Sequence, residues 1–382
     1  MAAPDPGFAL YIHWPFCLSK CPYCDFNSHV QAGVDHAQWR AALLDELDHY
    51  GKETSGRHLT SVFFGGGTPS LMAPGTAEAL LDKLSTYWIL DENLEVTLEA
   101  NPTSIETQKF HDFRTAGINR VSIGVQSLND GVLKFLGRGH SAIEARAALG
   151  IADNCFDRFS FDLIYARPGQ TPESWRRELT EALELAGDHL SLYQLTIEPG
   201  TPFYRDHVET LDDDRAAGLY ELTQALMEAA NRPAYEISNH AEPGRECRHN
   251  LTYWRGGDYV GIGPGAHGRI SHRGQTEATH QIHSPEAWLA AVKSRTHGTA
   301  KRRALTPEIR AQELIMMGLR LCGGFDTSSV LDQTGLAIAD VIDETGQARL
   351  IEGGVLARSG RYLTVTPEGR LRLNGVIKML LA

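Results

Sequence analysis

The sequence predicts an α/β fold: a partial (β/α)6 barrel of the TIM-barrel type, followed by a C-terminal α+β extension with a winged-helix-like pattern. Short apolar runs alternate with longer amphipathic runs from residue 9 to about residue 196, which is typical of repeated βα units around a parallel sheet. Beyond residue 303, helical patterns precede a short hairpin pattern. We therefore expect a barrel over residues 1–205, a barrel extension over 206–302 and a C-terminal domain over 303–382.

Six strands and five intervening helices are expected in the first half of the chain. The strands are predicted at Leu10–His13, Leu59–Phe64, Leu94–Glu99, Arg120–Val125, Arg158–Ile164 and His189–Leu195. The helices are predicted at His36–Gly51, Gly75–Tyr87, Ser104–Ala116, Ala142–Asp153 and Thr171–Leu185. Right-handed crossovers bring the carboxyl ends of such strands to one edge, where functional side chains are expected.

The second half has fewer apolar runs and more His, Pro and Gly. Helices are expected at Asp214–Ala230, Pro285–Thr296, Thr306–Leu321, Ser328–Gln333 and Ala339–Ile351. The stretch Arg361–Gly369 is expected to be a strand that enters a turn, with a last helix after it. The region after residue 328 is not strongly basic. A role in protein contact or in covering a substrate is therefore expected in preference to DNA binding.

Length, charge and hydropathy exclude some classes of protein. The chain has 382 residues and 36 basic against 48 acidic side chains, a formal charge of −12, which argues against a nucleic-acid partner. No apolar run approaches the length of a transmembrane segment. Residues 1–7 carry no basic residue and no apolar stretch follows them, so no signal peptide is expected. We therefore expect a cytoplasmic protein with reduced thiols.

The most specific pattern is the C-x-x-x-C-x-x-C spacing of Cys17, Cys21 and Cys24. Three thiolates this close can converge on one metal centre only if a short loop wraps around it. A four-iron, four-sulfide cluster takes four ligands, so three cysteines leave one iron open. A structural zinc site is the alternative, but no second C-x-x-C pair follows, although His29 is near.

Polar and glycine residues mark the ends of the later strands. The run Gly65–Ser70 follows the second strand, where it indicates either close approach of the backbone to a ligand or a tight turn. Carboxylate, amide and guanidinium groups follow at successive units, in Glu99, Gln126, Arg138 and Asp162. They suit recognition of a ribose, an ammonium or a carboxylate group. A solvated strand end for Glu99 and a buried supporting role for Asp162 are the alternatives.

Together with Tyr11-x-His13-x-Pro15-Phe16-Cys17, these residues resemble the oxygen-independent coproporphyrinogen III oxidase family of radical S-adenosylmethionine (SAM) proteins. The resemblance covers nearly the whole chain. It implies that Cys17, Cys21 and Cys24 hold a 4Fe-4S cluster whose open iron binds SAM, and that SAM is cleaved reductively. It also implies the residues of the SAM pocket, which would be Tyr11, Tyr23, Gly67, Thr68, Glu99, Gln126, Arg138 and Asp162.

Two features resemble the HemW-type branch of that family, whose members act as heme chaperones. The oxidases carry a further cysteine two positions after the third ligand, where this chain has Phe26. The stretch His249–Trp254 matches the H-N-x-x-Y-W signature of the branch. The resemblance implies heme binding by His249, Asn250, Tyr253 and Trp254, with His249 as the ligand of the heme iron.

Two further features of this region stay open. Cys247 is an alternative axial ligand, because thiolates also hold heme. The glycine-rich stretch Gly261–Gly268 is not a dinucleotide-binding fingerprint and is expected to be a loop that closes the barrel side of the site. The sequence alone assigns no ligand role to His267 within it.

The functional hypotheses differ in what the SAM site is used for. The favoured one is a heme chaperone that delivers heme to apo-hemoproteins, such as a membrane-bound respiratory enzyme, and works in the cytoplasm or peripherally at the inner face of the membrane. The alternative is a coproporphyrinogen III oxidase, because the intact SAM constellation is also compatible with enzymatic turnover. A zinc-bound winged-helix regulator is a third hypothesis, which the barrel pattern and the acidic charge disfavour.

Overall fold

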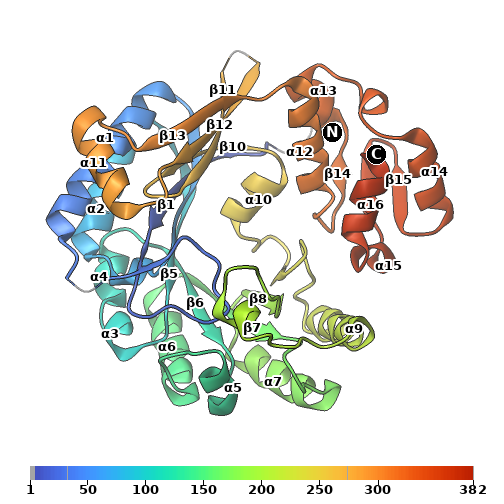
Figure 1. Ribbon diagram of the computed structural model, residues 1–382, viewed down its shortest axis with the longest axis horizontal. Coiled ribbons are helices and arrows are strands. Elements are labelled where there is room, and N and C mark those ends of the chain that lie inside the picture. Colours follow the sequence, from blue (N-terminus) through green and yellow to red (C-terminus); the bar gives the residue numbers. More distant parts are fainter. Residues whose placement is uncertain (1–4, 32, 273, 382) are drawn as a thin grey trace.

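The computed structural model describes residues 5–31, 33–272 and 274–381. In these residues one large sheet curves into an open arc, in the strand order β13-β12-β11-β10-β1-β4-β5-β6-β7-β8-β9 (Figure 1). In the part of this order that runs from β10 through β1 to β8, each strand is parallel to the strand beside it. These strands are β1 (Phe8–Trp14), β4 (His58–Gly66), β5 (Ile89–Ala100), β6 (Arg120–Gln126), β7 (Arg158–Tyr165), β8 (His189–Gln194) and β10 (Asp258–Ile262).

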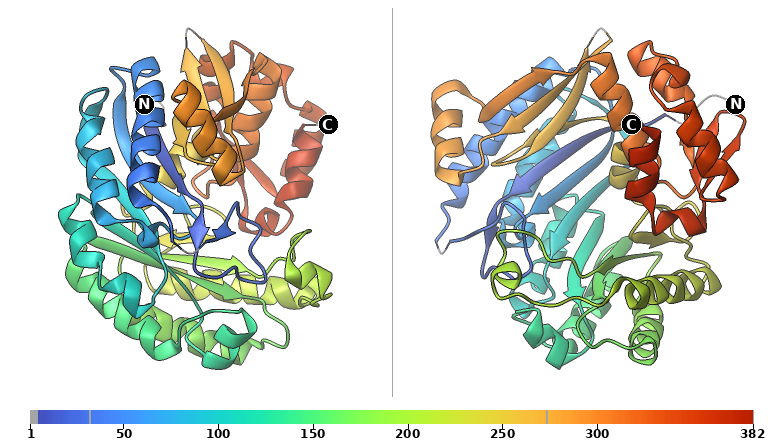
Figure 2. Two further views of the ribbon diagram at one scale, coloured as in Figure 1. Left: turned by 60° about the vertical axis from the view of Figure 1, so that its left-hand side comes forward. Right: turned by 45° about the vertical axis from the view of Figure 1, so that its right-hand side comes forward.

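Helices cover the convex face of the arc, as Figures 1 and 2 show. They are α1 (His36–Glu53), α2 (Pro74–Leu84), α3 (Ser104–Thr107), α4 (Phe110–Thr115), α5 (Asp130–Phe135), α6 (Ala142–Cys155) and α7 (Pro172–Leu185). Capping residues fix where two of these helices begin. Asp35 caps the N-terminus of α1, and Ser141 forms a capping box with Glu144 at the N-terminus of α6. β1 and its neighbours are buried on both faces, as a parallel sheet between two layers requires.

All six predicted strands are present, and the structure adds elements that the sequence did not predict. β10 joins the parallel sheet beside β1, and the antiparallel strands β9 (Asn239–Ala241), β11 (His267–His272), β12 (Gln275–Gln281) and β13 (Thr299–Ala304) extend it. The short strands β2 (Phe16–Cys17) and β3 (His29–Val30) pair with each other. The remaining elements before residue 305 are η1 (Pro69–Leu71), α8 (Pro202–Arg205), α9 (Asp213–Ala229), α10 (Arg248–Trp254) and α11 (Pro285–Arg295).

The single helix predicted over Ser104–Ala116 is wrong, because the chain forms α3 and α4 with a break at residues 108 and 109. The contacts of two side chains explain the break. The buried Glu106 carboxylate accepts hydrogen bonds from Ser70 Oγ and Asn101 N, and Lys109 Nζ donates to the carbonyls of Ser70 and Leu71. These contacts tie both sides of the break to the loop after β4.

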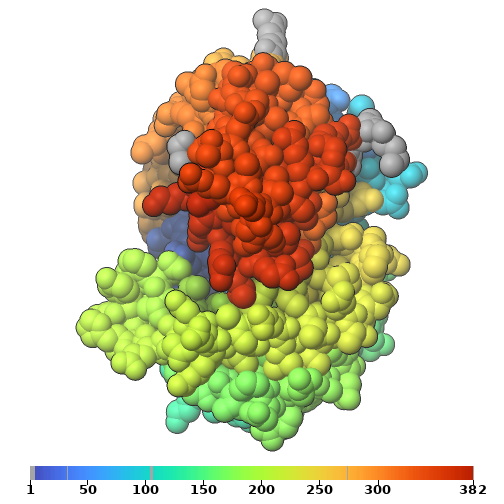
Figure 3. Space-filling view, turned by 90° about the vertical axis from the view of Figure 1, so that its right-hand side faces the viewer, coloured from blue at the N-terminus to red at the C-terminus, as the bar shows by residue number. Residues whose placement is uncertain are grey.

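The C-terminal region has its own apolar core, formed by residues between Ala311 and Leu380. Its elements are α12 (Pro307–Gly318), β14 (Phe325–Asp326), α13 (Ser328–Thr334), η2 (Ile338–Asp340), α14 (Glu344–Glu352), β15 (Leu356–Ser359), β16 (Tyr362–Val365), α15 (Pro367–Arg370) and α16 (Leu373–Leu380). The expected hairpin is formed by β15 and β16. In Figure 3 this region, coloured orange to red, fills the upper part of the face turned toward the viewer. The predicted boundaries at residues 205 and 302 stay predictions.

Candidate functional site

The three predicted cysteine ligands lie on one loop at the carboxyl end of β1. Cys17 ends β2, and Cys21 and Cys24 lie in the following loop, where Cys24 N donates to the carbonyl of Cys21. The pairing of β2 with β3 and the hydrogen bond from His29 N to the Pro15 carbonyl, 2.7 Å, close the base of this loop. All three cysteines line one cavity of about 420 Å3, which we call the cluster cavity.

Each of the three thiols has a polar neighbour that can donate a hydrogen bond to its sulfur. Thr68 Oγ1 lies 3.4 Å from Cys17 Sγ, and Ser28 Oγ lies 3.7 Å from Cys24 Sγ. Arg138 Nη1 lies 3.2 Å from Cys21 Sγ. Such donors stabilise thiolates, and hydrogen bonds to sulfur are a main control of the potential of an iron–sulfur cluster. The donor set therefore fits a cluster held by three thiolates.

Burial opposes ionisation of one of these thiols, because it raises the pKa of Cys17 above its ordinary value. A bound metal or a cationic neighbour offsets that cost. Among the described residues, no group of three His, Cys, Asp or Glu side chains is placed to hold a single metal ion.

The glycine run after β4 packs against the cysteine loop. A Cβ on Gly67 would lie 2.8 Å from the backbone oxygen of Phe16, and a Cβ on Gly66, whose φ is +115°, would lie 2.5 Å from the His13 ring. The amide N–H groups of Gly67 and Thr68 donate to the carbonyls of Trp14 and Phe16. Close backbone packing therefore requires both glycines, and it delivers Thr68 to the sulfur of Cys17.

Two carboxyl groups face the cluster cavity, Glu99 near the end of β5 and Asp162 within β7, and β6 lies between these two strands. Burial, with the nearby Asp162 charge, raises the pKa of Glu99 to about 8, and burial raises the pKa of Asp162 to about 6. Glu99 Oε2 accepts a hydrogen bond of 3.2 Å from Gly66 N. Carboxyls with raised pKa values in a cavity mark a candidate functional site, and a positive charge nearby would favour their ionised form.

Gln126 and Arg138 each present buried atoms without a partner in the described part of the chain. Gln126 has a left-handed φ of 68°, at a register shift between β6 and β7, and its Oε1 makes no hydrogen bond. Arg138 donates to Gly124 O and to Asn101 Oδ1, but its Nε has no partner. Backbone strain and unpaired polar atoms at a cavity wall are typical of ligand sites.

The eight residues predicted for SAM binding are brought together with one exception. Those that line the cluster cavity are Tyr23, Gly67, Thr68, Glu99, Gln126, Arg138 and Asp162. Asn101, which the sequence analysis did not assign, joins them by donating 3.1 Å from Nδ2 to Thr68 Oγ1. Its place two residues after Glu99, at a strand end, was the signal that could have identified it.

Tyr11 lies instead at an adjoining cavity of about 530 Å3, which we call the second cavity. Its hydroxyl group is 3.1 Å from His13 Nδ1. The two cavities share Phe26, Gly66 and Glu99 in their walls, and Phe26 is 66% exposed. The other residues that line the two cavities differ. The second cavity is lined by Tyr11, His13, Phe26, Asn27, Gly66, Glu99, Tyr253, Tyr259, Gly265, His267, His283 and Met317.

The predicted heme-binding motif forms α10, on the concave side of the sheet (Figure 1). His249 is 2% exposed and stacks on Phe63 at 4.9 Å between ring centroids. Both of its ring nitrogens have partners, Ser61 Oγ at 3.2 Å from Nδ1 and Tyr253 Oη at 2.7 Å from Nε2. Burial lowers the pKa of His249 to about 3, so its ring is neutral.

The other residues of the motif do not share one pocket. Tyr253 lines the second cavity, whereas Trp254 lines a third cavity of about 600 Å3 beside the C-terminal domain. Asn250 Nδ2 donates 3.1 Å to Tyr235 Oη. The structure therefore places only Tyr253, with His249 behind it, next to the cluster site, and the heme-binding roles stay predictions.

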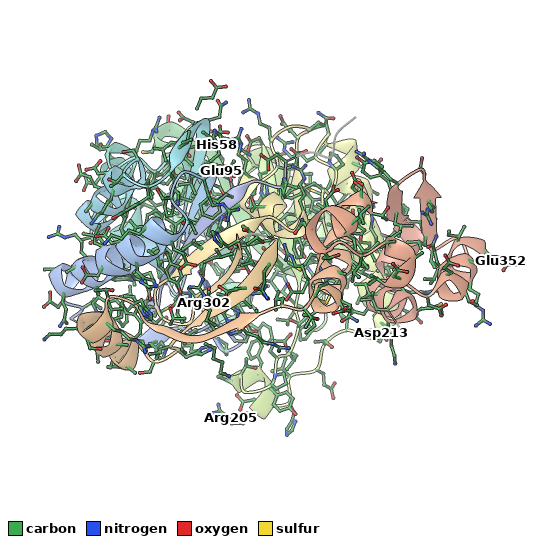
Figure 4. The ribbon with its side chains drawn as sticks, turned by 90° about the horizontal axis from the view of Figure 1, so that it is seen from above. His58, Glu95, Arg205, Asp213, Arg302 and Glu352 are labelled. Atoms are coloured by element: carbon green, nitrogen blue, oxygen red, sulfur yellow. The ribbon has the colours of Figure 1, made fainter. Side chains whose placement is uncertain are left out.

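Cys247, the alternative axial ligand, is buried at the start of α10. Its Sγ lies 3.4 Å from Glu95 Oε1, and Glu95 is labelled on β5 in Figure 4. Burial, with the nearby Glu95 charge, raises the pKa of Cys247 to about 12. A neutral, enclosed thiol of this kind is a poor metal ligand until it is deprotonated and exposed.

Comparison with known proteins identifies the family. Residues 11–182 match the radical SAM superfamily model, and residues 305–372 match the HemN C-terminal domain model. The chain is 38% identical to the heme chaperone HemW of Escherichia coli K12 over 380 residues that cover 99% of each protein. It is 37% identical over 384 residues to a mitochondrial radical SAM domain-containing protein 1 of Danio rerio, covering 98% of this chain and 86% of that protein.

A solved structure shares the whole fold. The coproporphyrinogen III oxidase HemN of Escherichia coli, a radical SAM enzyme, superposes with a TM-score of 0.83 at 24% identity, over 99% of this chain and 90% of that one. The fold prediction, a partial radical SAM barrel with a C-terminal extension, is thereby confirmed. The chain belongs to the radical SAM superfamily, in the HemW-type branch of its coproporphyrinogen III oxidase-like proteins.

Proposed function

We propose that this protein is a heme chaperone, which carries a SAM-ligated 4Fe-4S cluster, binds heme and delivers it to apo-hemoproteins. The observation that carries the proposal is Phe26. At the position where the oxidases of the family have a further cysteine, this chain places an aromatic ring that is 66% exposed at the junction of the two cavities. An exposed aromatic face offers contact to a flat apolar macrocycle and cannot take part in electron or proton transfer as a thiol can.

The cluster cavity is assigned to the cluster and SAM. Cys17, Cys21 and Cys24 would hold the cluster, and the sulfur neighbours Thr68 and Arg138 would set its potential. When bound, this pair of cofactors supplies reductive cleavage of SAM. The residues of the chain would bind and orient SAM, and those proposed to do so are Tyr23, Gly67, Thr68, Glu99, Gln126, Arg138 and Asp162.

Heme is assigned to the second cavity, next to α10. The wall is aromatic, with Tyr11, Tyr253 and Tyr259, and the volume of about 530 Å3 falls in the usual range for ligand pockets, about 300–1,000 Å3. Direct ligation by His249 would require its hydrogen bond to Tyr253 Oη to break. The role predicted for His249 as axial ligand therefore stays a prediction.

Coproporphyrinogen III oxidase activity is the alternative function, favoured by the complete set of cavity residues around the three cysteines. The two functions differ in their products. A chaperone binds heme and returns it unchanged. The oxidase would convert two propionate groups of coproporphyrinogen III into vinyl groups, and each conversion would release CO2, pass a hydrogen atom to the 5′-deoxyadenosyl group of SAM and pass one electron to an external acceptor. Fold similarity alone does not choose between them.

The experiment uses reconstituted full-length protein under anaerobic conditions. One equivalent of heme is added to the wild type and to Cys21→Ala, and in parallel coproporphyrinogen III is offered with SAM and a reductant. A shifted Soret band without formation of protoporphyrinogen IX supports the chaperone. Turnover of coproporphyrinogen that disappears in Cys21→Ala would make the protein an oxidase and refute the proposal.

The proposed recipient is an apo-hemoprotein, such as a respiratory enzyme in the membrane. No helix in the described residues is long and apolar enough to cross a membrane. We propose that delivery takes place in the cytoplasm or at the inner membrane face. Pull-down of the heme-loaded protein with solubilised respiratory complexes tests this, with the heme-free protein as the control.

A further inference from the structure

We propose that His267, and not His249, supplies the imidazole ligand to the iron of heme bound in the second cavity. The inference rests on the proposed heme-binding function and names the residue that performs it. The wall of the second cavity comes from distant parts of the chain. Three distant segments meet there, Phe26 from the cysteine loop, His267 from β11 and Met317 from α12 of the C-terminal domain.

Only some of the imidazoles near this cavity have a nitrogen that could bind iron. His13 has both ring nitrogens in hydrogen bonds, to Tyr11 Oη at 3.1 Å and to Asn27 O at 2.9 Å. His249 is likewise saturated, and it lies behind Tyr253 without reaching the cavity wall. Among the described residues, none makes a hydrogen bond to the ring of His267, which is exposed at the cavity.

The ring of His267 is held by packing. It stacks on the ring of His280, directly opposite on β12, with 4.0 Å between centroids and 30° between planes. A ligand on a paired strand is held more precisely than one on a loop, which is where His283, the other exposed imidazole of the cavity, lies. The geometry therefore favours His267 over His283.

The cavity also offers an apolar contact for a porphyrin face. This contact is the polarisable thioether of Met317, which α12 brings to the cavity wall.

This assignment gives His249 a different task. Its Nε2 holds Tyr253 Oη at 2.7 Å, and Tyr253 forms part of the cavity wall. His249 is then a positioning residue, whose loss would disturb the wall without removing the iron ligand. Loss of His267 should therefore change the spectrum of bound heme, whereas loss of His249 should not, because only the loss of a ligand changes the coordination of the iron.

The test is a heme titration of reconstituted full-length protein, followed by optical and electron paramagnetic resonance spectra. The variants are His267→Gly, His249→Ala and, as the matched control, His272→Gly at the exposed end of the same strand and outside the second cavity. We expect His267→Gly to lose the ligated spectrum and to bind heme at least about tenfold more weakly. Added imidazole should restore the spectrum in this variant, which a merely misfolded chain could not do. His272→Gly should bind heme like the wild type, and His249→Ala should bind heme more weakly but keep the ligated spectrum.

Two outcomes would overturn the inference. If His267→Gly keeps the wild-type spectrum while His249→Ala loses it and recovers it with imidazole, His249 is the ligand and the proposed function still stands. If the wild type itself binds no heme, the proposed function fails together with the inference. The titration therefore distinguishes the two failures.

Discussion

Replacing Arg138 with methionine tests the electrostatics of the cluster cavity. The guanidinium Nη1 lies 3.2 Å from Cys21 Sγ, in a position that buries most of the side chain. A hydrogen bond to a charged group contributes about 1.5–3 kcal/mol. Because the reduced cluster carries one more negative charge, Arg138 stabilises it more than the oxidised cluster. The potential depends on the difference between the two oxidation states, so the whole hydrogen bond sets an upper limit: a difference of about 2 kcal/mol corresponds to a fall of roughly 90 mV in a one-electron potential.

The assay for Arg138→Met is an anaerobic redox titration of the reconstituted cluster, followed by electron paramagnetic resonance. Arg138→Lys is the matched control, because it keeps the positive charge and loses the planar fork that also binds Gly124 O and Asn101 Oδ1. We expect the methionine variant to shift strongly to lower potential and the lysine variant to shift less. An unchanged potential in Arg138→Met, at full iron content, would refute the reasoning.

Two further predictions concern residues around this site. Gly67→Ala should lower both the free energy of unfolding in urea and the iron content after reconstitution, because its Cβ would lie 2.8 Å from Phe16 O. Gly75→Ala in α2 is the control, because a Cβ there would lie 3.9 Å from an Arg40 side-chain nitrogen, and it should stabilise the fold by about 0.5 kcal/mol. Burial raises the pKa of Glu46 from 4.5 to about 7, so the folded chain holds this proton more tightly than the unfolded chain. The free energy of unfolding should therefore fall as pH rises from about 4.5 to about 7, and Glu46→Gln should remove that part of the slope in urea titrations at several pH values; a wild-type slope retained by the variant would contradict this.

The cluster cavity could be predicted from the sequence because its residues lie in short local patterns. The cysteine spacing fixes one loop, and Glu99, Gln126 and Asp162 stand at or near the ends of strands that apolar runs identify. Parallel strands align their carboxyl ends, so local positions become neighbours in space without knowledge of any long-range contact. Arg138 follows by the same rule, because it lies after the fourth strand in the loop region of the same edge.

The second cavity could not be predicted in this way, because it depends on pairings between distant segments. β10 pairs with β1 across about 250 residues, from Phe8 opposite Asp258 to Ile12 opposite Ile262. β13 is an edge strand whose residues are mostly exposed, so it lacks the apolar alternation that identifies a strand. His267 reaches the cavity only through these strands, and Met317 only through the docking of α12.

For the motif His249–Trp254, the sequence identifies the residues and the structure shows where each side chain lies. The sequence identified a set of residues worth attention, but it could not indicate that the helix α10 turns them in different directions. His249 packs against Phe63 beneath the sheet, Tyr253 faces the second cavity, and Trp254 faces the third. Burial and hydrogen-bond partners are properties of the packed chain, and they are what separates a ligand from a supporting residue.

The most direct test of the central claim is heme transfer. Heme-loaded protein with its reconstituted cluster is mixed anaerobically with a heme-depleted respiratory hemoprotein, and the recovery of the recipient's spectrum and activity is followed, with free heme as the control. The account predicts faster or more complete recovery than with free heme, and no conversion of coproporphyrinogen III in a parallel sample. Recovery no better than with free heme, together with conversion of coproporphyrinogen III, would contradict it.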